Sequence, residues 1–170
     1  EVASAFAGGT LSYSLSGTDA GTFSINSSTG VVTINAIPDY EAKSSYSINV
    51  TASDGTLTGT QAVTVSVSDV APSFSSGTAG SVTEGATAGT TVYTAAASDV
   101  AGGAVTFSLS GSDAGSFSIN SSTGVVTINA IPDYEAKSSY SIDVVASDGT
   151  LSSTQAVTVS VADVAPAISS

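Results

Sequence analysis

Apolar and polar residues alternate with a period of two along most of this chain. Between residues 45 and 52, Tyr46, Ile48, Val50 and Ala52 alternate with Ser, Asn and Thr. Successive side chains of a β-strand point to opposite faces, so this pattern is typical of a strand that is buried on one face only. Similar alternation recurs along the chain between Gly, Asn, Asp, Ser or Pro residues, and no helical periodicity competes with it. The sequence therefore predicts an all-β fold.

The second half of the chain contains seven such segments. We predict strands at residues 80–84, 90–97, 104–110, 116–120, 125–129, 139–147 and 154–162. Turn sequences such as SDVAGG, SGSDAG and NSSTG separate them. Seven short strands in a segment of this length indicate a Greek-key, immunoglobulin-like β-sandwich.

The chain contains an internal repeat. Residues 13–72 recur at residues 107–166, shifted by 94 positions and with only eight exchanges. The sequence Asp-Val-Ala-Pro closes each copy after a Val-rich segment, and proline cannot extend the hydrogen-bond ladder of a strand. We therefore predict tandem domains: a repeat at 1–72, a complete repeat at 73–166 and the start of a further repeat at 167–170.

The first repeat lacks a counterpart of residues 73–94. We therefore predict a sandwich that is truncated on its N-terminal side, without its first strands, and we interpret the chain as an excerpt of a longer protein. A processed subunit is the alternative interpretation.

The charge of the chain excludes two classes of partner. The chain contains fourteen acidic residues and only two basic ones, Lys43 and Lys137, which gives a net charge of −12. Such a chain cannot neutralise a phosphate backbone or bind an anionic lipid surface electrostatically. No apolar run is long enough to span a bilayer, so we predict neither nucleic-acid binding nor membrane insertion. Only 9% of the residues are charged, and this hydroxyl-rich composition suits an extracellular or surface-displayed repeat.

Catalytic chemistry has little support in the sequence. The chain contains neither histidine nor cysteine, so the commonest general base and the thiol nucleophile are both missing. The close carboxylate pairs are copied in both repeats, whereas a glycosidase pair is expected to be unique. We predict that the chain is not an enzyme.

Those repeated carboxylate pairs are Asp39-Tyr40-Glu41 and Asp133-Tyr134-Glu135. In an extended segment the two acids would share one side, and the tyrosine would point the other way, into the core. Paired carboxylate oxygens suit Ca²⁺, which takes six to eight oxygen ligands. The alternative is that the acids are turn and cap residues, because Asp hydrogen-bonds local backbone without any metal.

The sequence resembles bacterial cadherin-like repeats over essentially its whole length. The resemblance rests on FSINSSTGVVTINAIPDYEAKSSYSINVTASDGT followed by VTVSVSDVAP. It implies tandem cadherin-like sandwiches that bind calcium between successive domains. The acids that bind it lie on the first strand, in an Asp-x-Glu triplet, in the segment after the second strand, before a glycine after the sixth strand, and in the linker. The residues that match these positions are Asp39, Glu41, Asp54, Asp69, Glu84, Asp99, Asp133, Glu135, Asp148 and Asp163.

Some positions depart from the pattern that the resemblance implies. The linker is shortened to Asp-Val-Ala-Pro, and Ala101 stands where a second carboxylate is expected. Ala5 replaces the acid at the N-terminal pole of the first repeat. The resemblance therefore implies fewer calcium ions, with one ligand set at the junction of the repeats, formed by Asp39, Glu41, Asp69, Asp99 and Asp148.

We interpret the chain as a structural and adhesive repeat of a large bacterial surface or secreted protein, in which calcium stiffens an extended stalk. Its partners would be neighbouring repeats of the same chain and a cell-surface ligand. One alternative is an extracellular filament subunit that joins identical chains by strand complementation. The other is a carbohydrate-binding module for extracellular polysaccharide.

Overall fold

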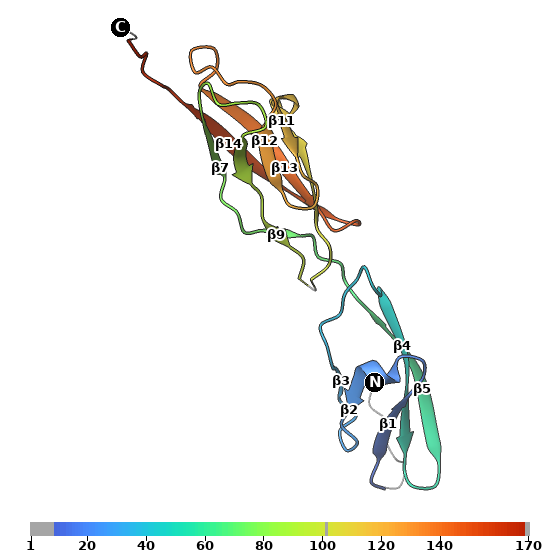
Figure 1. The fold of residues 1–170 in the computed structure, drawn as a ribbon. Helices are drawn as coiled ribbons and strands as arrows, with labels where there is room; N and C mark the ends of the chain where they lie inside the picture. Colours follow the sequence, from blue (N-terminus) through green and yellow to red (C-terminus); the bar gives the residue numbers. More distant parts are fainter. Residues whose placement is uncertain (1–8, 101, 169–170) are drawn as a thin grey trace. The chain divides into compact units, whose positions relative to one another are not determined.

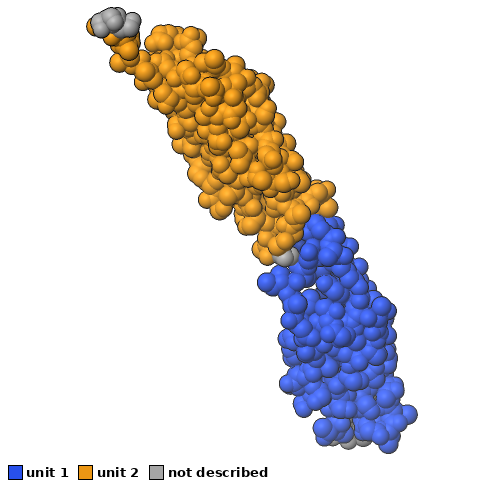
Figure 2. Space-filling view, in the orientation of Figure 1, with its two compact units in different colours: residues 1–69 blue, residues 70–170 orange. Residues whose placement is uncertain are grey.

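The computed structural model describes residues 9–100 and 102–168, and the chain divides into two units. Unit 1 comprises residues 1–69 and unit 2 residues 70–170 (Figure 2). Ala5, Ala101 and the last two residues of the predicted third repeat lie outside the described residues.

Unit 2 is a β-sandwich (Figure 1). Its strands are β6 (Ser73–Phe74), β7 (Ala79–Thr83), β8 (Thr91–Thr94), β9 (Ala97–Ser98), β10 (Thr106–Ser110), β11 (Phe117–Ile119), β12 (Val125–Ile128), β13 (Ser139–Ser147) and β14 (Ser152–Ala162). One sheet has the order β10-β13-β14-β7 and the other β11-β12-β8, while β6 and β9 form a short pair. The all-β, seven-stranded sandwich predicted from the sequence is thereby confirmed.

The strand predicted at residues 90–97 is in fact two strands. Between β8 and β9 the Ala95 N–H donates to the carbonyl of Gly124, and the Ala96 carbonyl accepts from the N–H of Ser75. These bonds tie consecutive residues to different neighbouring segments, so the chain leaves one sheet and pairs with β6. Periodicity alone gave no sign of this switch, because the apolar run Ala95-Ala96-Ala97 continues through it.

The inward faces of the two sheets form the core of unit 2. Val126 on β12 packs in the same cluster as Ile142 and Val144 on β13 and Val159 on β14, and each of the four is completely buried. Most of their neighbours along the strands are Ser, Thr and Asp residues, as the alternating pattern predicts, and the exceptions are Val125 and Val145. β14 pairs antiparallel with β13 and parallel with β7, so β7 covers the outer edge of β14.

Unit 1 repeats only part of this arrangement. Its strands are β1 (Ser12–Ser16), β2 (Phe23–Ile25), β3 (Val32–Ile34), β4 (Ser45–Ser53) and β5 (Thr58–Ser66). They form a sheet of order β1-β4-β5 and a pair β2-β3, which correspond to β10-β13-β14 and β11-β12 of unit 2. No described residue of unit 1 takes the place of β7 or β8.

The interior of unit 1 is less covered by its described residues than the interior of unit 2 is. Ile34 is 38% exposed, whereas its counterpart Ile128 in unit 2 is 2% exposed. Val65 on β5 is half-buried, whereas its counterpart Val159 is fully buried. Because the surrounding sequences are almost identical, the difference comes from the absence of the covering strands and not from composition.

The described part of the chain contains no helix long and apolar enough to cross a membrane. The only helical segments in it are two single 3₁₀ turns, η1 (Ala20–Thr22) and η2 (Ala114–Ser116).

Candidate metal centre

Glu84 follows β7 directly and connects two other segments of unit 2. Its N–H donates to the carbonyl of Ala162 at 2.9 Å, which continues the parallel pairing of β7 with β14. Its Oε1 accepts from the N–H of Val164 at 2.6 Å, and its Oε2 accepts from the N–H of Tyr134 at 3.1 Å. The half-buried Glu84 carboxylate therefore holds the segment after β14 beside the turn that precedes β13.

These bonds bring three acidic side chains together. Glu84, Glu135 and Asp163 each offer a carboxylate oxygen, and the three oxygens lie within 4.8 Å of one another. Glu135 and Asp163 are exposed. Like charges at this distance repel, so the arrangement is unfavourable unless a cation or protons neutralise it.

The chemistry of the three donors fits a hard cation such as Ca²⁺. Carboxylate oxygens are its preferred ligands, and each carboxylate has more lone pairs than one backbone hydrogen bond uses. Glu84 can therefore accept its two backbone bonds and still face a cation. Because Ca²⁺ takes six to eight oxygens, water and backbone carbonyls would complete the shell.

Unit 1 contains the corresponding pair of acids. Glu41 and Asp69 occupy the positions of Glu135 and Asp163, and their nearest carboxylate oxygens also lie within 4.8 Å of each other. The position of Glu84 has no counterpart in the sequence of unit 1. Two of the three acidic positions of unit 2 therefore recur in unit 1.

The Asp-x-Glu triplets do not form the extended segments that we predicted. Tyr134 to Ala136 form a turn, in which Asp133 Oδ1 accepts from the Ala136 N–H at 3.1 Å and the Asp133 carbonyl accepts from the Lys137 N–H at 2.9 Å. Asp133 caps this turn and Glu135 joins the acidic cluster, so the two acids have separate roles. Tyr134 is 37% exposed, so the prediction that it points into the core was wrong.

The triplet of unit 1 forms the same turn. Asp39 Oδ1 accepts from the Ala42 N–H at 3.0 Å, and its carbonyl accepts from the Lys43 N–H at 2.9 Å. Asp39 is therefore a cap residue in the same sense as Asp133.

Asp54 and Asp148 lie in the hairpin turns that join β4 to β5 and β13 to β14. Asp148 Oδ1 accepts from the N–H groups of Thr150 at 2.8 Å and Leu151 at 2.7 Å, and these bonds lower the pKa of Asp148. Backbone bonds from Leu57 and then Thr56 lower the pKa of Asp54 in the same way. One carboxylate oxygen of each residue therefore holds its own turn, as the alternative of turn and cap residues predicts. The other oxygen of Asp148, Oδ2, is buried and has no hydrogen-bond partner in the described part of the chain.

Asp99 is the one buried charged residue among those described, with 9% of its surface exposed. It follows β9, and its carbonyl accepts from the N–H of Gly102 at 3.2 Å. Of the predicted junction set, Asp39, Glu41 and Asp69 belong to unit 1, and Asp99 and Asp148 belong to unit 2. That set stays a prediction.

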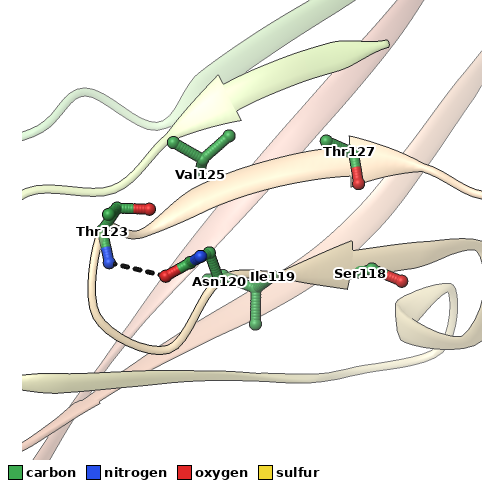
Figure 3. A pocket seen from close by; sticks show the side chains of 6 residues that line it. All are labelled: Ser118, Ile119, Asn120, Thr123, Val125 and Thr127. Atoms are coloured by element: carbon green, nitrogen blue, oxygen red, sulfur yellow. Dashed lines mark hydrogen bonds between the residues drawn. The ribbon is translucent and has the colours of Figure 1, made fainter. Parts of the chain in front are cut away.

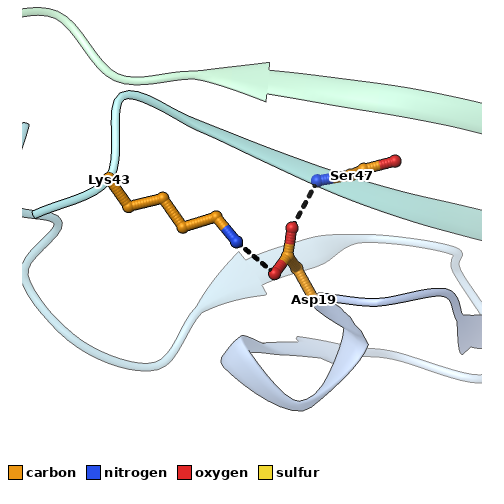
Figure 4. A network of polar contacts seen from close by, with 3 residues as sticks. All are labelled: Asp19, Lys43 and Ser47. Atoms are coloured by element: carbon orange, nitrogen blue, oxygen red, sulfur yellow. Dashed lines mark hydrogen bonds and ion pairs between the residues drawn. The ribbon is translucent and has the colours of Figure 1, made fainter.

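A second polar cluster was missed from the sequence. Lys43 donates to Asp19 Oδ1, and Asp19 Oδ2 accepts from the N–H of Ser47 at 2.7 Å (Figure 4). The Lys43 bond first, and the Ser47 bond second, lower the pKa of Asp19. Lys43 also lies 5.2 Å from the centroid of the Tyr46 ring, close enough for a cation–π contact.

The same cluster recurs in unit 2 as Lys137, Asp113, Ser141 and Tyr140. A signal for it existed in the sequence, because each of the two lysines follows an aspartate by 24 positions. The sequence SG(T/S)DAG around both aspartates is also typical of a simple turn between strands, so it does not single out the lysine partner.

A surface pocket of unit 2 lies along β11 and β12. Asn120 Oδ1 accepts from the N–H of Thr123 at 3.0 Å at one end of it (Figure 3). The pocket is lined by Ser118, Ile119, Asn120, Thr123, Val125 and Thr127. None of these side chains is aromatic, so the pocket offers no ring on which a sugar could stack.

Comparison with known proteins gives consistent matches over most of the chain. The Cadherin domain family matches residues 6–68 and 78–162. Mouse Protocadherin Fat 4 is 39% identical over 147 residues, which cover 80% of this chain and 3% of that protein. Human Protocadherin-23 is 33% identical over 166 residues, which cover 92% of this chain and 5% of that protein. The chain therefore spans a small part of the relatives that it matches.

Solved structures give the same result. A crystal structure of mouse Cadherin-23 EC22-24 superposes with a TM-score of 0.54 and 30% identity, covering 91% of this chain and 53% of that one. The Protocadherin gammaB7 EC3-6 cis-dimer structure superposes with a TM-score of 0.53 and 28% identity, covering 89% and 40%. The relatives named here whose organism is known are from mouse and human, so they lend no support to the bacterial source expected from the sequence.

Proposed function

The chain belongs to the cadherin domain family, and from this premise we propose that it is a structural and adhesive extracellular repeat that calcium stiffens. The observation that carries the proposal is the convergence of Glu84, Glu135 and Asp163 at one pole of unit 2. Three segments that are distant in sequence meet there.

Calcium would act at this pole as a clamp. Glu135 belongs to the turn before β13, Asp163 follows β14, and Glu84 follows β7. A cation bound to all three would tie these segments together and would remove the mutual repulsion of the carboxylates. The segment after β14 begins at Asp163, so the clamp would restrict its motion relative to the sandwich.

Calcium titration of variants of the full chain tests this proposal. We expect Glu135→Gln and Asp163→Asn each to weaken calcium binding by about tenfold or more, because changes even beyond the direct ligands of a metal cost this much. Isothermal titration calorimetry measures the affinity. Asp143→Asn is the matched control, because unit 1 carries Asn49 at the same position. Unchanged affinity in both cluster variants would contradict the proposal.

The proposed partners are other cadherin-type repeats. The Protocadherin gammaB7 EC3-6 structure is a cis-dimer, which supports association of this chain with repeats of the same type. The pocket along β11 and β12 has no aromatic side chain on which a sugar ring could stack, so it does not favour a polysaccharide partner. We propose a non-enzymatic role, because rigid spacing and adhesion need a stable fold and a metal clamp but no reacting group.

A further inference from the structure

Three asparagines of the chain lie in the sequence Asn-x-Ser/Thr, where x is not proline. They are Asn26 and Asn120, each followed by Ser-Ser, and Asn49, which is followed by Val-Thr. This is the acceptor sequence for N-linked glycosylation, a modification of secreted and extracellular proteins. The cadherin relatives of this chain are extracellular proteins. Such short sequences also occur by chance in a chain rich in serine and threonine, so the surroundings of each asparagine must distinguish them.

The internal repeat keeps two of these sequences and loses the third. Asn-Ser-Ser is identical in the two copies. Asn49 is replaced by Asp143 in the second copy, and Thr51 is replaced by Val145. Both positions that the modification requires are therefore lost from Asn-Val-Thr, whereas the repeat retains Asn-Ser-Ser in full.

Asn120 lies in the exposed turn between β11 and β12. Its Oδ1 accepts from the N–H groups of Ser122 and Thr123, both at 3.0 Å. Only an oxygen can accept these bonds, so they fix which atom of the carboxamide is the nitrogen. Nδ2 of Asn120 and the hydroxyl of Ser122 make no hydrogen bond with the described residues, and both side chains are exposed. The two groups that the acceptor sequence needs are therefore accessible together.

Asn26 has the same surroundings in unit 1. Its Oδ1 accepts from the N–H groups of Ser28 and Thr29, both at 3.0 Å. Asn26 and Ser28 are exposed. The turn between β2 and β3 therefore presents the same acceptor.

Asn49 lies in a different setting. It belongs to β4, the middle strand of its sheet, where it is paired with Ser16 on β1 and Ala62 on β5 and is half-buried. The hydroxyl of its acceptor sequence belongs to Thr51 and lies 2.9 Å from the Thr60 hydroxyl, in a side-chain hydrogen bond. Asn49 thus has neither the exposed turn nor the accessible hydroxyl that Asn120 has.

The pocket along β11 and β12 provides a surface on which the first sugar can lie. Asn120 lines the end of it that is next to the turn (Figure 3). Its volume is about 510 Å³, which is within the range of small-molecule sites. Half-buried Val125 offers an apolar contact to an acetyl methyl group, and Thr127 offers a hydroxyl. A sugar that is attached covalently does not need an aromatic ring to hold it there.

From these observations we infer that Asn120 carries an N-linked glycan whose first sugar, an N-acetylhexosamine, lies on the β11–β12 surface, and that Asn26 is modified in the same way. In the transfer, Nδ2 attacks C1 of an oligosaccharide that is carried on a polyprenyl pyrophosphate. The bond from Nδ2 to C1 forms, and the bond from C1 to the pyrophosphate oxygen breaks. The polyprenyl pyrophosphate leaves with the electron pair, and Nδ2 loses one proton to a base of the transferase. The chain supplies only the acceptor.

Secretion of the full chain from mammalian cells, behind a signal sequence that is cleaved, tests the inference. Enzymatic release of N-linked glycans in heavy-oxygen water converts each modified asparagine into an aspartate that carries one heavy oxygen. Peptide mass spectrometry then gives the occupancy of each site. We expect the occupancy of Asn120 and of Asn26 to be at least about fivefold that of Asn49.

Two serine variants separate the acceptor sequence from the turn. Ser122→Ala should remove the modification at Asn120, because it removes the hydroxyl but keeps the N–H that Asn120 Oδ1 binds. Ser121→Ala is the matched control, because any residue except proline is accepted at that position. The inference is overturned if Asn120 is unmodified in the native chain, if it is still modified in Ser122→Ala, or if its occupancy does not exceed that of Asn49. An unmodified Asn26 overturns the extension to unit 1.

Thermal unfolding in chelator tests where the first sugar lies. After each glycan is trimmed to one sugar, unit 2 should unfold at least about 2 °C higher than unit 2 of Ser122→Ala, because the sugar covers apolar surface. Val125→Thr should reduce this difference and leave the occupancy of Asn120 unchanged, because it removes an apolar contact outside the acceptor sequence. Equal unfolding temperatures of the trimmed chain and Ser122→Ala would overturn the placement of the sugar on this surface.

Discussion

At the scale of single residues, the acids of this chain divide into two kinds. Asp133 and Asp148 accept hydrogen bonds from backbone N–H groups two or three positions further along, and they hold turns. Glu84, Glu135 and Asp163 converge from three separate segments. Sequence spacing did not separate the kinds, because both occur in the segments outside the strands. The second kind has the geometry of a shared cation site within unit 2.

Glu84 should stabilise unit 2 even without a metal. Its carboxylate accepts two backbone bonds, from Val164 and Tyr134, and both donors would lose their partner in Glu84→Ala. We expect this variant to lower the free energy of unfolding of unit 2 in chelator by about 1–3 kcal/mol. Urea denaturation measures it, with Asp143→Asn as the control. An unchanged free energy would show that these bonds contribute nothing to the fold.

The Asp113 cluster predicts a pH dependence. A hydrogen bond from Lys137 first, and one from Ser141 second, lower the pKa of Asp113 below its value in the unfolded chain. The carboxylate therefore adds stability above the unfolded pKa, about 3.9, and this stability is lost as the pH falls through the lower pKa of the folded state.

We expect the unfolding temperature of unit 2 to change less between pH 5 and about pH 2.5 in Asp113→Asn than in the native chain, because the variant lacks the carboxylate whose pKa folding lowers. Circular dichroism melting curves at each pH measure the difference. Identical pH profiles would mean that the Lys137 bond does not persist in solution.

At the scale of the strands, the two units form an internal comparison. The same sequence TGVVTIN forms β3 in unit 1 and β12 in unit 2, yet only β12 is covered by a further strand. Burial in this protein thus depends on which strands are neighbours as well as on the strand's own pattern. Alternation says which face of a strand is apolar, but it does not say whether that face is covered.

Truncation of one isoleucine in each unit tests this comparison. Ile128→Ala should lower the free energy of unfolding of unit 2 by about 2–5 kcal/mol, because it leaves a cavity in a closed core. Ile34→Ala should cost clearly less in unit 1, because the native side chain is already 38% exposed. Denaturation followed by hydrogen exchange assigns each loss to its unit. Equal losses would mean that the interior of unit 1 is closed in solution.

At the scale of the whole molecule, the chain should not unfold in one step. Unit 2 has a closed core, whereas unit 1 has an open one, so the two units differ in the apolar surface that they bury. Differential scanning calorimetry should therefore show two transitions, with unit 1 unfolding at the lower temperature.

Calcium should move the upper of these transitions. A ligand at about 100 times its dissociation constant adds about 2.7 kcal/mol to the folded state that binds it, and the complete cluster of three acids belongs to unit 2. Calorimetry in millimolar calcium and in chelator measures the shift. If calcium does not move the upper transition, it does not bind at Glu84, Glu135 and Asp163 as proposed.

The sequence by itself determined the β-sandwich and the repetition of its strands. Alternation with period two is a local property of consecutive residues, so the strand from Ser139 to Ser147 could be predicted with its actual bounds. The repeat offset was equally visible, because it needs only comparison of the chain with itself.

Only the tertiary structure decided which of the acids meet and which surface stays open. The bonds of Glu84 join residues that are 50 and 80 positions apart, and they depend on the parallel register of β7 against β14. Spacing in the sequence does not contain that register, because it is set by the pairing of two strands that are distant in the chain. For the same reason only the structure shows how far Val65 and Ile34 remain uncovered, and that Asp19 binds a lysine 24 positions away.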